Sequence, residues 1–204
     1  MASLLTDVLA KAVEVDGYEY PVRWQFQYGI VIERALHDEA LSQDERWWVA
    51  LSTFYAAQIP ENIEAAIARM CAFLVREKPL NRAQKRVAAK QRDTAALFCY
   101  QHDDEYIFAA FMQQYGINLA REVDLHWHEF QALLHALDDC PFARVKGWRG
   151  ADLSKIKGAE ARRQAGELKA LWALPEPQGQ EELVDALEEA LMGDGDLRGV
   201  LGNH

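Results

Sequence analysis

The stretch that decides the fold is residues 123–137, which read VDLHWHEFQALLHAL. Five apolar side chains recur in it with the three- and four-residue spacing of an amphipathic helix. They are Trp127, Phe130, Leu133, Leu134 and Leu137. Asp124 stands where an N-cap belongs, because its carboxylate could accept the unpaired amides of a first turn. The stretch predicts a packed helix, with Trp127, Phe130 and Leu134 at the centre of its buried face.

The histidines of the same stretch raise the question of a metal site. In a strand His126 and His128 would share a face, but in a helix they lie about 200° apart and cannot hold one ion. His128 and His135 are separated by a rise of roughly 10 Å, and His126 with Glu129 would supply only two ligands. We therefore expect helix-surface histidines, with no metal and no other cofactor.

Composition bounds the class of protein. The chain has 204 residues, of which 50% are hydrophobic, 10% aromatic and 26% charged, as in soluble globular proteins. The net charge of −10 argues against a nucleic-acid partner, because phosphate contacts need a basic face. No apolar run approaches the ~20 residues that span a bilayer, so we expect neither export nor a membrane. Three widely spaced cysteines, Cys71, Cys99 and Cys140, suggest reduced side chains in a cytosolic protein.

The first part of the chain predicts one β-hairpin followed by helices. Asp16-Gly17 supplies the positive-φ pair of a type I′ turn between alternating strands, and Pro21 should end the second strand. A short helix-like run, SLLTDVLAKA, precedes the hairpin, and helices are expected at 24–37, 43–56 and 61–77. The second of these starts with a capping box of Ser42 and Glu45. The apolar stripe expected on the third is Ile63, Ile67, Met70 and Leu74.

The later part of the chain predicts a helix hairpin. Asp103 should cap a helix that ends at Gly116 in a left-handed turn, and this helix should fold back against the one in 123–137. The stripe expected on the first of these helices is Ile107, Phe108, Phe111 and Tyr115. After Cys140-Pro141 the chain is rich in glycine and turn-prone. A further helix, AEARRQAGELKALWAL, should bury Ala161, Ala165, Leu168 and Trp172.

The fold class expected is therefore mostly α, a helical bundle with an N-terminal β-hairpin. Four parts are expected: a hairpin with helices at 1–77, a basic linker or helix at 78–94, a C-terminal helical part at 95–175 and an acidic amphipathic tail at 176–204. Residues 76–92 hold seven basic residues and one acid, whereas 176–204 hold eight acids and one arginine. These charges either form solvated surface or meet, within one chain or between neighbours.

Two further motifs suggest a function. Trp47 and Trp48 are about 100° apart on a helix, so one of them should face a second interface or a groove. His102-Asp103 resembles the doublet of metal-dependent phosphohydrolases, and His126 and His128 would be its further ligands. That hydrolase is the less favoured reading, because acids at a helix N-terminus already explain Asp103.

Taken as a whole, residues 98–157 resemble the phage gene-product-fifteen family of tailed bacteriophages, and looser similarity extends over 12–175. The matching residues are Tyr115, Gly116, Ile117, Asn118, Leu119, Leu125, His126, Trp127, Phe130, Leu133, Trp148, Arg149, Asp152, Leu153, Ser154 and Ile156. The chain departs at His128, where the family more often has a second tryptophan.

The resemblance implies a phage tail assembly protein without catalytic residues, which works as a chaperone in the host cell cytoplasm. It would keep the tape measure protein soluble during assembly of the tail tube, whose subunit is a possible second partner, and self-association is expected. The candidate partner-binding residues are Trp47, Trp48, Trp148 and Arg149. The alternative is a structural virion component, a tail completion or connector subunit.

Overall fold

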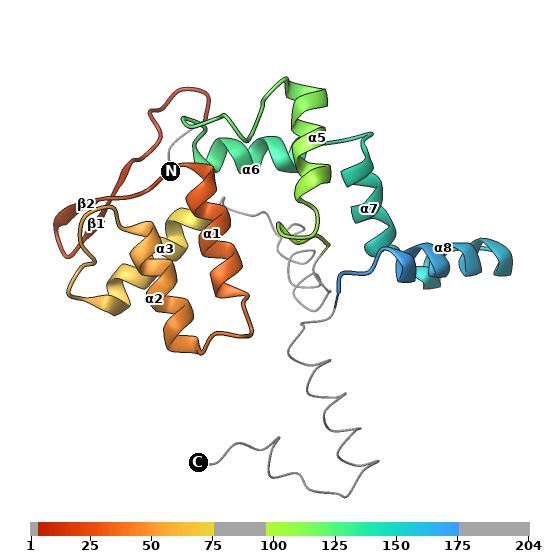
Figure 1. The fold of residues 1–204 in the computed structure, drawn as a ribbon, viewed down its shortest axis with the longest axis horizontal. Helices are drawn as coiled ribbons and strands as arrows, with labels where there is room; N and C mark the ends of the chain where they lie inside the picture. The colour runs from red at the N-terminus through yellow and green to blue at the C-terminus, as the bar shows by residue number, and fades with distance from the viewer. Residues whose placement is uncertain (1–3, 76–96, 176–204) are drawn as a thin grey trace, which may run out of the picture.

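The computed structural model describes residues 4–75 and 97–175. The fold is mostly helical with an N-terminal two-stranded hairpin, which confirms the expected class. The hairpin and the first helices lie at one end of the long axis, and the last helices lie at the other (Figure 1). The predicted linker at 78–94 and the predicted tail at 176–204 lie outside the described residues.

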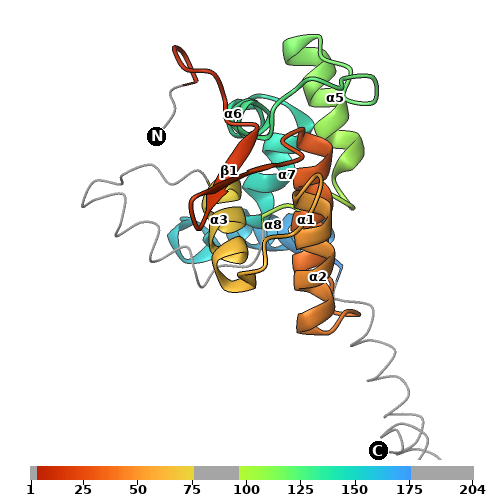
Figure 2. The same ribbon diagram turned by 90° about the vertical axis from the view of Figure 1, so that its left-hand side faces the viewer.

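The hairpin forms as its sequence predicts. Strand β1 (Ala12–Val15) pairs antiparallel with β2 (Tyr18–Pro21). Asp16 and Gly17 take φ values of 51° and 83°, the two positive values that a type I′ turn needs. The strand β1 lies against the third helix, α3, as Figure 2 shows.

Three helices follow the hairpin within the predicted ranges. They are α1 (Phe26–Leu36), α2 (Gln43–Phe54) and α3 (Ile63–Val75). The predicted capping box starts α2: Ser42 Oγ accepts from the Glu45 amide, and the Ser42 amide donates to the Glu45 carboxylate. The helix expected in SLLTDVLAKA is wrong, since its described residues form turns before β1 begins at Ala12. A run of ten residues in which Leu5 and Val8 are exposed is too short to be stable as an isolated helix.

The predicted helix hairpin is formed by α5 (Asp104–Tyr115) and α6 (Trp127–Ala136). Gly116 ends α5 at φ 67°. The rings of Phe111 and Phe130 stack with centroids 5.2 Å apart, and the Tyr115 hydroxyl donates to the Leu133 carbonyl at 2.9 Å. The predicted buried stripe of α5 is wrong at Phe108. It lies on the exposed side of α5, and Ala110 is buried in its place.

The region after Cys140 contains a helix that sequence analysis missed. Helix α7 (Pro141–Arg149) has proline at its first position, where no backbone donor is lost, and it buries Phe142 and Val145. The short 3₁₀ helix η1 (Leu153–Lys155) and helix α8 (Ala159–Leu171) follow. The predicted burial of α8 is only partial: Ala161 is exposed, and Ala165, Leu168 and Trp172 are half-buried. Within the described residues, α8 packs mainly on α7 and η1.

One hydrophobic core joins residues from both sides of the 76–96 segment. Its largest fully buried side chains are Trp127, Phe54, Phe111, Phe130 and Phe142. The helices that contribute to it are α1, α2, α3, α5, α6 and α7. The first and second halves of the chain therefore depend on each other for their interior.

Candidate partner-binding surface

The start of α6 shows what the histidine-tryptophan-histidine motif does. The N-cap is His126, and the prediction of Asp124 is wrong. His126 Nδ1 accepts from the His128 amide at 3.1 Å, and the His126 amide donates to the Glu129 carboxylate at 3.0 Å. A capping box usually starts with serine or threonine, and here an imidazole nitrogen replaces the hydroxyl. The motif begins a helix.

The two histidines are close together, contrary to the prediction that they point apart. Their ring centroids are 4.8 Å apart, because His126 precedes the helix in an extended conformation. His126 is also buried and is not a surface residue. Its Nε2 contacts the Ala10 carbonyl at 3.0 Å, and His128 Nε2 contacts the Phe73 carbonyl at 2.7 Å. Within 4–75 and 97–175, no group of three or more His, Cys, Asp or Glu residues has a metal-binding arrangement.

Trp127 is the point where the two halves of the chain meet. Its amide donates to the Trp24 carbonyl at 2.8 Å, and its indole Nε1 donates to the Leu74 carbonyl at 3.0 Å. The indole lies directly on Gly29 of α1, where a Cβ atom would overlap it. Trp127, Phe130 and Leu134 are fully buried, which confirms them as core.

Asp103 and Arg149 form a buried ion pair that replaces the predicted cap. Arg149 Nη1 and Nη2 donate to the two oxygens of the Asp103 carboxylate at 2.6 and 3.0 Å. Only 1% of the Asp103 side chain and 9% of the Arg149 side chain are exposed. Arg149 also donates to the carbonyls of Trp172 at 2.6 Å and Leu97 at 3.2 Å. Asp103 makes no side-chain capping bond to α5, since its carboxylate is turned toward Arg149 and the Cys99 amide.

Two of the predicted partner-binding residues, Trp148 and Arg149, lie at or beside this ion pair. Arg149 ties the start of α5 to the end of α8, and Trp148 is half-buried against Trp172, with ring centroids 5.4 Å apart. Of the two residues in the hydrolase-like doublet, Asp103 is paired with Arg149, and His102 is exposed. Asp103 is therefore buried, whereas Trp148 and Arg149 are half-buried, and their role in binding a partner stays a prediction.

The remaining predicted pair, Trp47 and Trp48, lies on α2. Trp47 packs on the core, whereas 64% of Trp48 is exposed, so the expectation that only one of them faces the core is confirmed. Trp48 borders an open depression between the end of α2 and the start of α3. The residues that line it are Arg23, Trp48, Ser52, Tyr55, Ala56, Ala57, Gln58, Ile59 and Ile63.

The depression is mostly apolar with one cation at its wall. Arg23 Nη1 donates to the carbonyls of Ser52 at 2.8 Å and Thr53 at 2.9 Å, so the guanidinium satisfies the end of α2. Burial raises the pKa of Tyr55 to about 12, and its hydroxyl donates to the Ala66 carbonyl at 2.9 Å. Such a surface suits an apolar side chain with a carboxylate beside it.

Sequence reasoning missed most of this surface. Ile63 was expected in the buried stripe of α3, but 46% of it is exposed at the start of the helix. No pattern in the sequence pointed to Arg23 and Ile59, because both line the depression from segments outside the helices. The only pointer in the sequence was the adjacent pair of tryptophans.

None of the helices in the described ranges is both long and apolar enough to span a bilayer. No curated protein and no solved structure matches the chain. A family model described as Bacteriophage Gp15 protein does match, and it covers residues 5–174. This range contains every helix and strand of the described structure. Because the match extends over most of the sequence, the chain belongs to the Bacteriophage Gp15 family.

Proposed function

We propose that this protein is a phage tail assembly chaperone that binds the tape measure protein in the host cell cytoplasm. It would keep that long apolar partner soluble while the tail tube subunits polymerise, and it would associate with itself and with the tube subunit in doing so. Membership of a bacteriophage family supports a role in phage biology. The net charge of −10 favours solubility of a complex with an apolar partner.

One observation carries the proposal: a tryptophan and an isoleucine stay exposed beside the same apolar depression. Trp48 and Ile63 come from different helices, and both line it. Large exposed apolar side chains that gather around a hollow are typical of binding sites, and tryptophan is enriched among the residues that dominate binding energy. An amphipathic helix from the partner could place apolar side chains there, with an acidic residue toward Arg23.

The test is co-expression with the tape measure protein of the same phage. We expect the native chain to raise the soluble fraction of the tape measure and to co-purify with it. Trp48→Ala should reduce both by roughly tenfold or more, as expected for loss of a binding hot spot. Tyr18→Ala is the matched control, because Tyr18 is an equally exposed aromatic residue on the hairpin. The proposal is lost if the native chain neither solubilises nor binds the tape measure.

A structural virion subunit is the second candidate. Phe108 and Met112 lie one turn apart on α5, and both are exposed, so the molecule has a second apolar surface that could contact a neighbouring subunit. A tail completion or connector subunit needs such contacts on more than one side. Mass spectrometry of purified virions separates the two candidates, since a chaperone leaves the particle and a connector stays in it.

A further inference from the structure

Helix α5 has an exposed side that combines apolar side chains with an acid. Glu105, Phe108 and Met112 follow one another at steps of three and four residues, so they form one stripe along the helix, which we call the α5 stripe. All three are exposed, whereas Ile107 and Phe111 turn toward the core. Within the described residues, no basic side chain lies within 4 Å of the Glu105 carboxylate. The α5 stripe is therefore an apolar surface with an unpaired negative charge at one end.

The depression beside Trp48 is also apolar, but it carries the opposite charge. Trp48 and Ile63 are exposed at its edge, and Arg23 lies at its wall. Arg23 Nη1 donates to backbone carbonyls, and the described part of the chain places no carboxylate within 4 Å of this guanidinium. Glu61 and Glu64 are the acids nearest to Ile63 in sequence, and neither lines the depression. A carboxylate that entered this Trp48 depression would meet a cation without a counter-charge.

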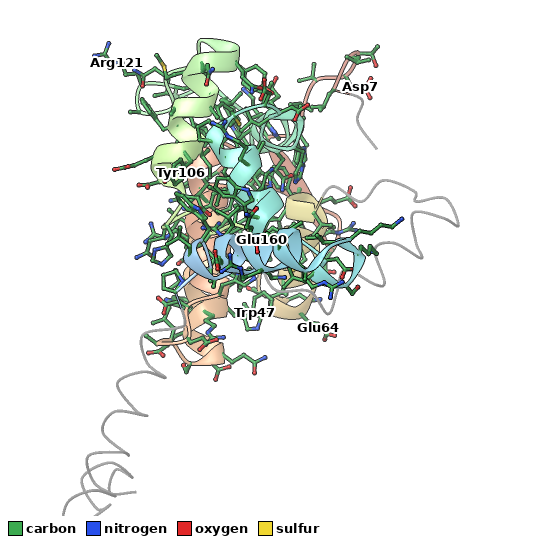
Figure 3. All side chains as sticks on the ribbon, turned by 90° about the vertical axis from the view of Figure 1, so that its right-hand side faces the viewer. Asp7, Trp47, Glu64, Tyr106, Arg121 and Glu160 are labelled. Carbon is green, nitrogen blue, oxygen red and sulfur yellow. The ribbon has the colours of Figure 1, made fainter. Side chains whose placement is uncertain are left out.

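The α5 stripe and the Trp48 depression of one molecule lie apart. Helix α5 packs on α6 and α7, whereas the depression lies between the end of α2 and the start of α3. Figures 1 and 2 both show α5 above α2 and α3. Figure 3 shows the same separation from another side, with Tyr106 of α5 well above Trp47 of α2 and Glu64 of α3. The two surfaces can therefore meet only between two molecules.

We propose that the α5 stripe of one molecule docks in the Trp48 depression of a second copy of this chain, so that copies join head to tail. Phe108 and Met112 would fill the apolar part of the depression, as an amphipathic helix does in a groove. Glu105 would supply the counter-charge that Arg23 lacks. Charge also opposes the two symmetric alternatives, because stripe against stripe brings two Glu105 carboxylates together, and depression against depression brings two Arg23 cations together.

The contact uses the same depression as the proposed function, but it does not depend on the identity of the phage partner. A partner helix in the depression would displace the neighbour on that side only, since the copy's own α5 stripe stays engaged with the next copy. Nine residues line the depression, against roughly 20–30 on each side of a standard interface, so the association should be weak and dependent on concentration.

Sedimentation velocity of the full-length chain over a range of concentrations tests the contact. The native chain should associate increasingly as its concentration rises. Trp48→Ala and Met112→Lys change exposed residues of the depression and of the α5 stripe, and each should raise the dissociation constant by about tenfold or more. Gln113→Lys is the matched control, because it adds the same charge to the next exposed residue of α5, off the stripe, and should associate like the native chain. Glu105→Lys is the second stripe variant and should weaken association about three- to tenfold.

An equal mixture of Trp48→Ala and Met112→Lys identifies the head-to-tail arrangement. The first variant retains its α5 stripe and the second retains its depression, so the mixture should form a one-to-one dimer and no larger species. Circular dichroism of each variant checks that it is folded like the native chain.

Four results would overturn the proposal. They are a native chain that stays monomeric at every concentration, a mixture that does not associate, and native-like association of either variant alone. Association of Trp48→Ala alone would indicate contact between two α5 stripes, and association of Met112→Lys alone would indicate contact between two depressions. Met112→Lys leaves the depression intact, so solubilisation of the tape measure by this variant tests the proposed function separately.

Discussion

Arg149 holds both carboxylate oxygens of Asp103 at 2.6 and 3.0 Å in a setting almost closed to solvent. The two residues are 46 positions apart in sequence. Parallel contacts of this kind are stronger than ordinary hydrogen bonds and depend on the fork shape of the guanidinium. The pair joins the start of α5 to the end of α7, so the relative placement of these helices depends on it.

Removal of one partner of this pair should strongly destabilise the protein. Asp103→Ala leaves the Arg149 cation buried without a counter-charge, so we expect the free energy of unfolding to fall by about 3–5 kcal/mol in urea titrations. Lys155→Ala removes an exposed ion pair with Asp152 and should cost less than about 1 kcal/mol. Equal losses in the two variants would mean that the buried pair contributes no more than surface charge.

Gly29→Ala should weaken the contact between α1 and α6. The new methyl group would overlap the Trp127 indole, which is itself enclosed by the core, so a loss of about 1–3 kcal/mol is expected. Gly147→Ala is the matched control, because Gly147 is also helical but has open space around its Cβ position. There the change should stabilise by about 0.5–1 kcal/mol through helix propensity. Thermal unfolding of the two variants should therefore shift in opposite directions.

The Glu33 carboxyl group should make the free energy of unfolding depend on pH, and Glu33→Gln should remove this dependence. Burial raises the pKa of Glu33, and the nearby His37 only partly opposes this. A carboxyl group with a raised folded pKa stabilises fully below its unfolded pKa, and this contribution is lost as the pH rises through the folded value.

Glu33→Gln should therefore stabilise the protein at pH 7 and have little effect near pH 4. The gain should stay below about 1 kcal/mol because the side chain is one-third exposed. Urea titrations at both pH values measure it, and Glu39→Gln on the surface provides the control. A gain at pH 4 as large as that at pH 7 would show that the effect is not electrostatic.

His126→Ala should cost about 2–3 kcal/mol in unfolding free energy. It removes the acceptor that caps α6 and leaves a buried region without the ring contact to the Ala10 carbonyl. His102→Ala changes an exposed histidine and should be neutral in the same assay. If His126→Ala left the free energy of unfolding unchanged, the capping box at the start of α6 would not contribute to stability.

Deletion after Leu174 should leave the thermal midpoint almost unchanged. Within the described residues the buried core cluster ends at Phe142. Residues 176–204 hold eight acids and one arginine, a composition with little apolar surface to bury. Differential scanning calorimetry of the full-length and shortened chains makes the comparison. A fall of more than about 5 °C would assign the last residues to the core.

The elements that sequence analysis predicted correctly depend on residues a few positions apart. Asp16-Gly17 specifies its turn, Ser42 and Glu45 specify the start of α2, and Gly116 specifies the end of α5. Each of these signals is complete within four residues, so no knowledge of the tertiary structure is needed. The hairpin and most helix positions could therefore be predicted.

The errors occurred where distant residues compete for the same group. An aspartate at the start of a helix suits both a cap and an ion pair, and only the position of Arg149 decides for Asp103. Helix α7 was missed because Gly147 and Gly150 outweighed the start signal of Pro141. The pair of tryptophans predicted that one of them faces outward, but the choice of Trp48 depends on how α2 is rotated against the core.

The backbone contact between the start of α1 and the start of α6 sets an order for folding during synthesis. Gln25 and His126 pair across about a hundred residues of chain, and the Trp127 amide reaches back to Trp24. Until the ribosome has released α6, the side of α1 that carries Phe26 and Gly29 lacks the Phe130 ring and the Trp127 indole that pack on it in the fold. Contacts this distant in sequence form late and slow the folding rate. A nascent chain stalled before Trp127 should thus expose the apolar side of α1 that α6 covers in the finished fold.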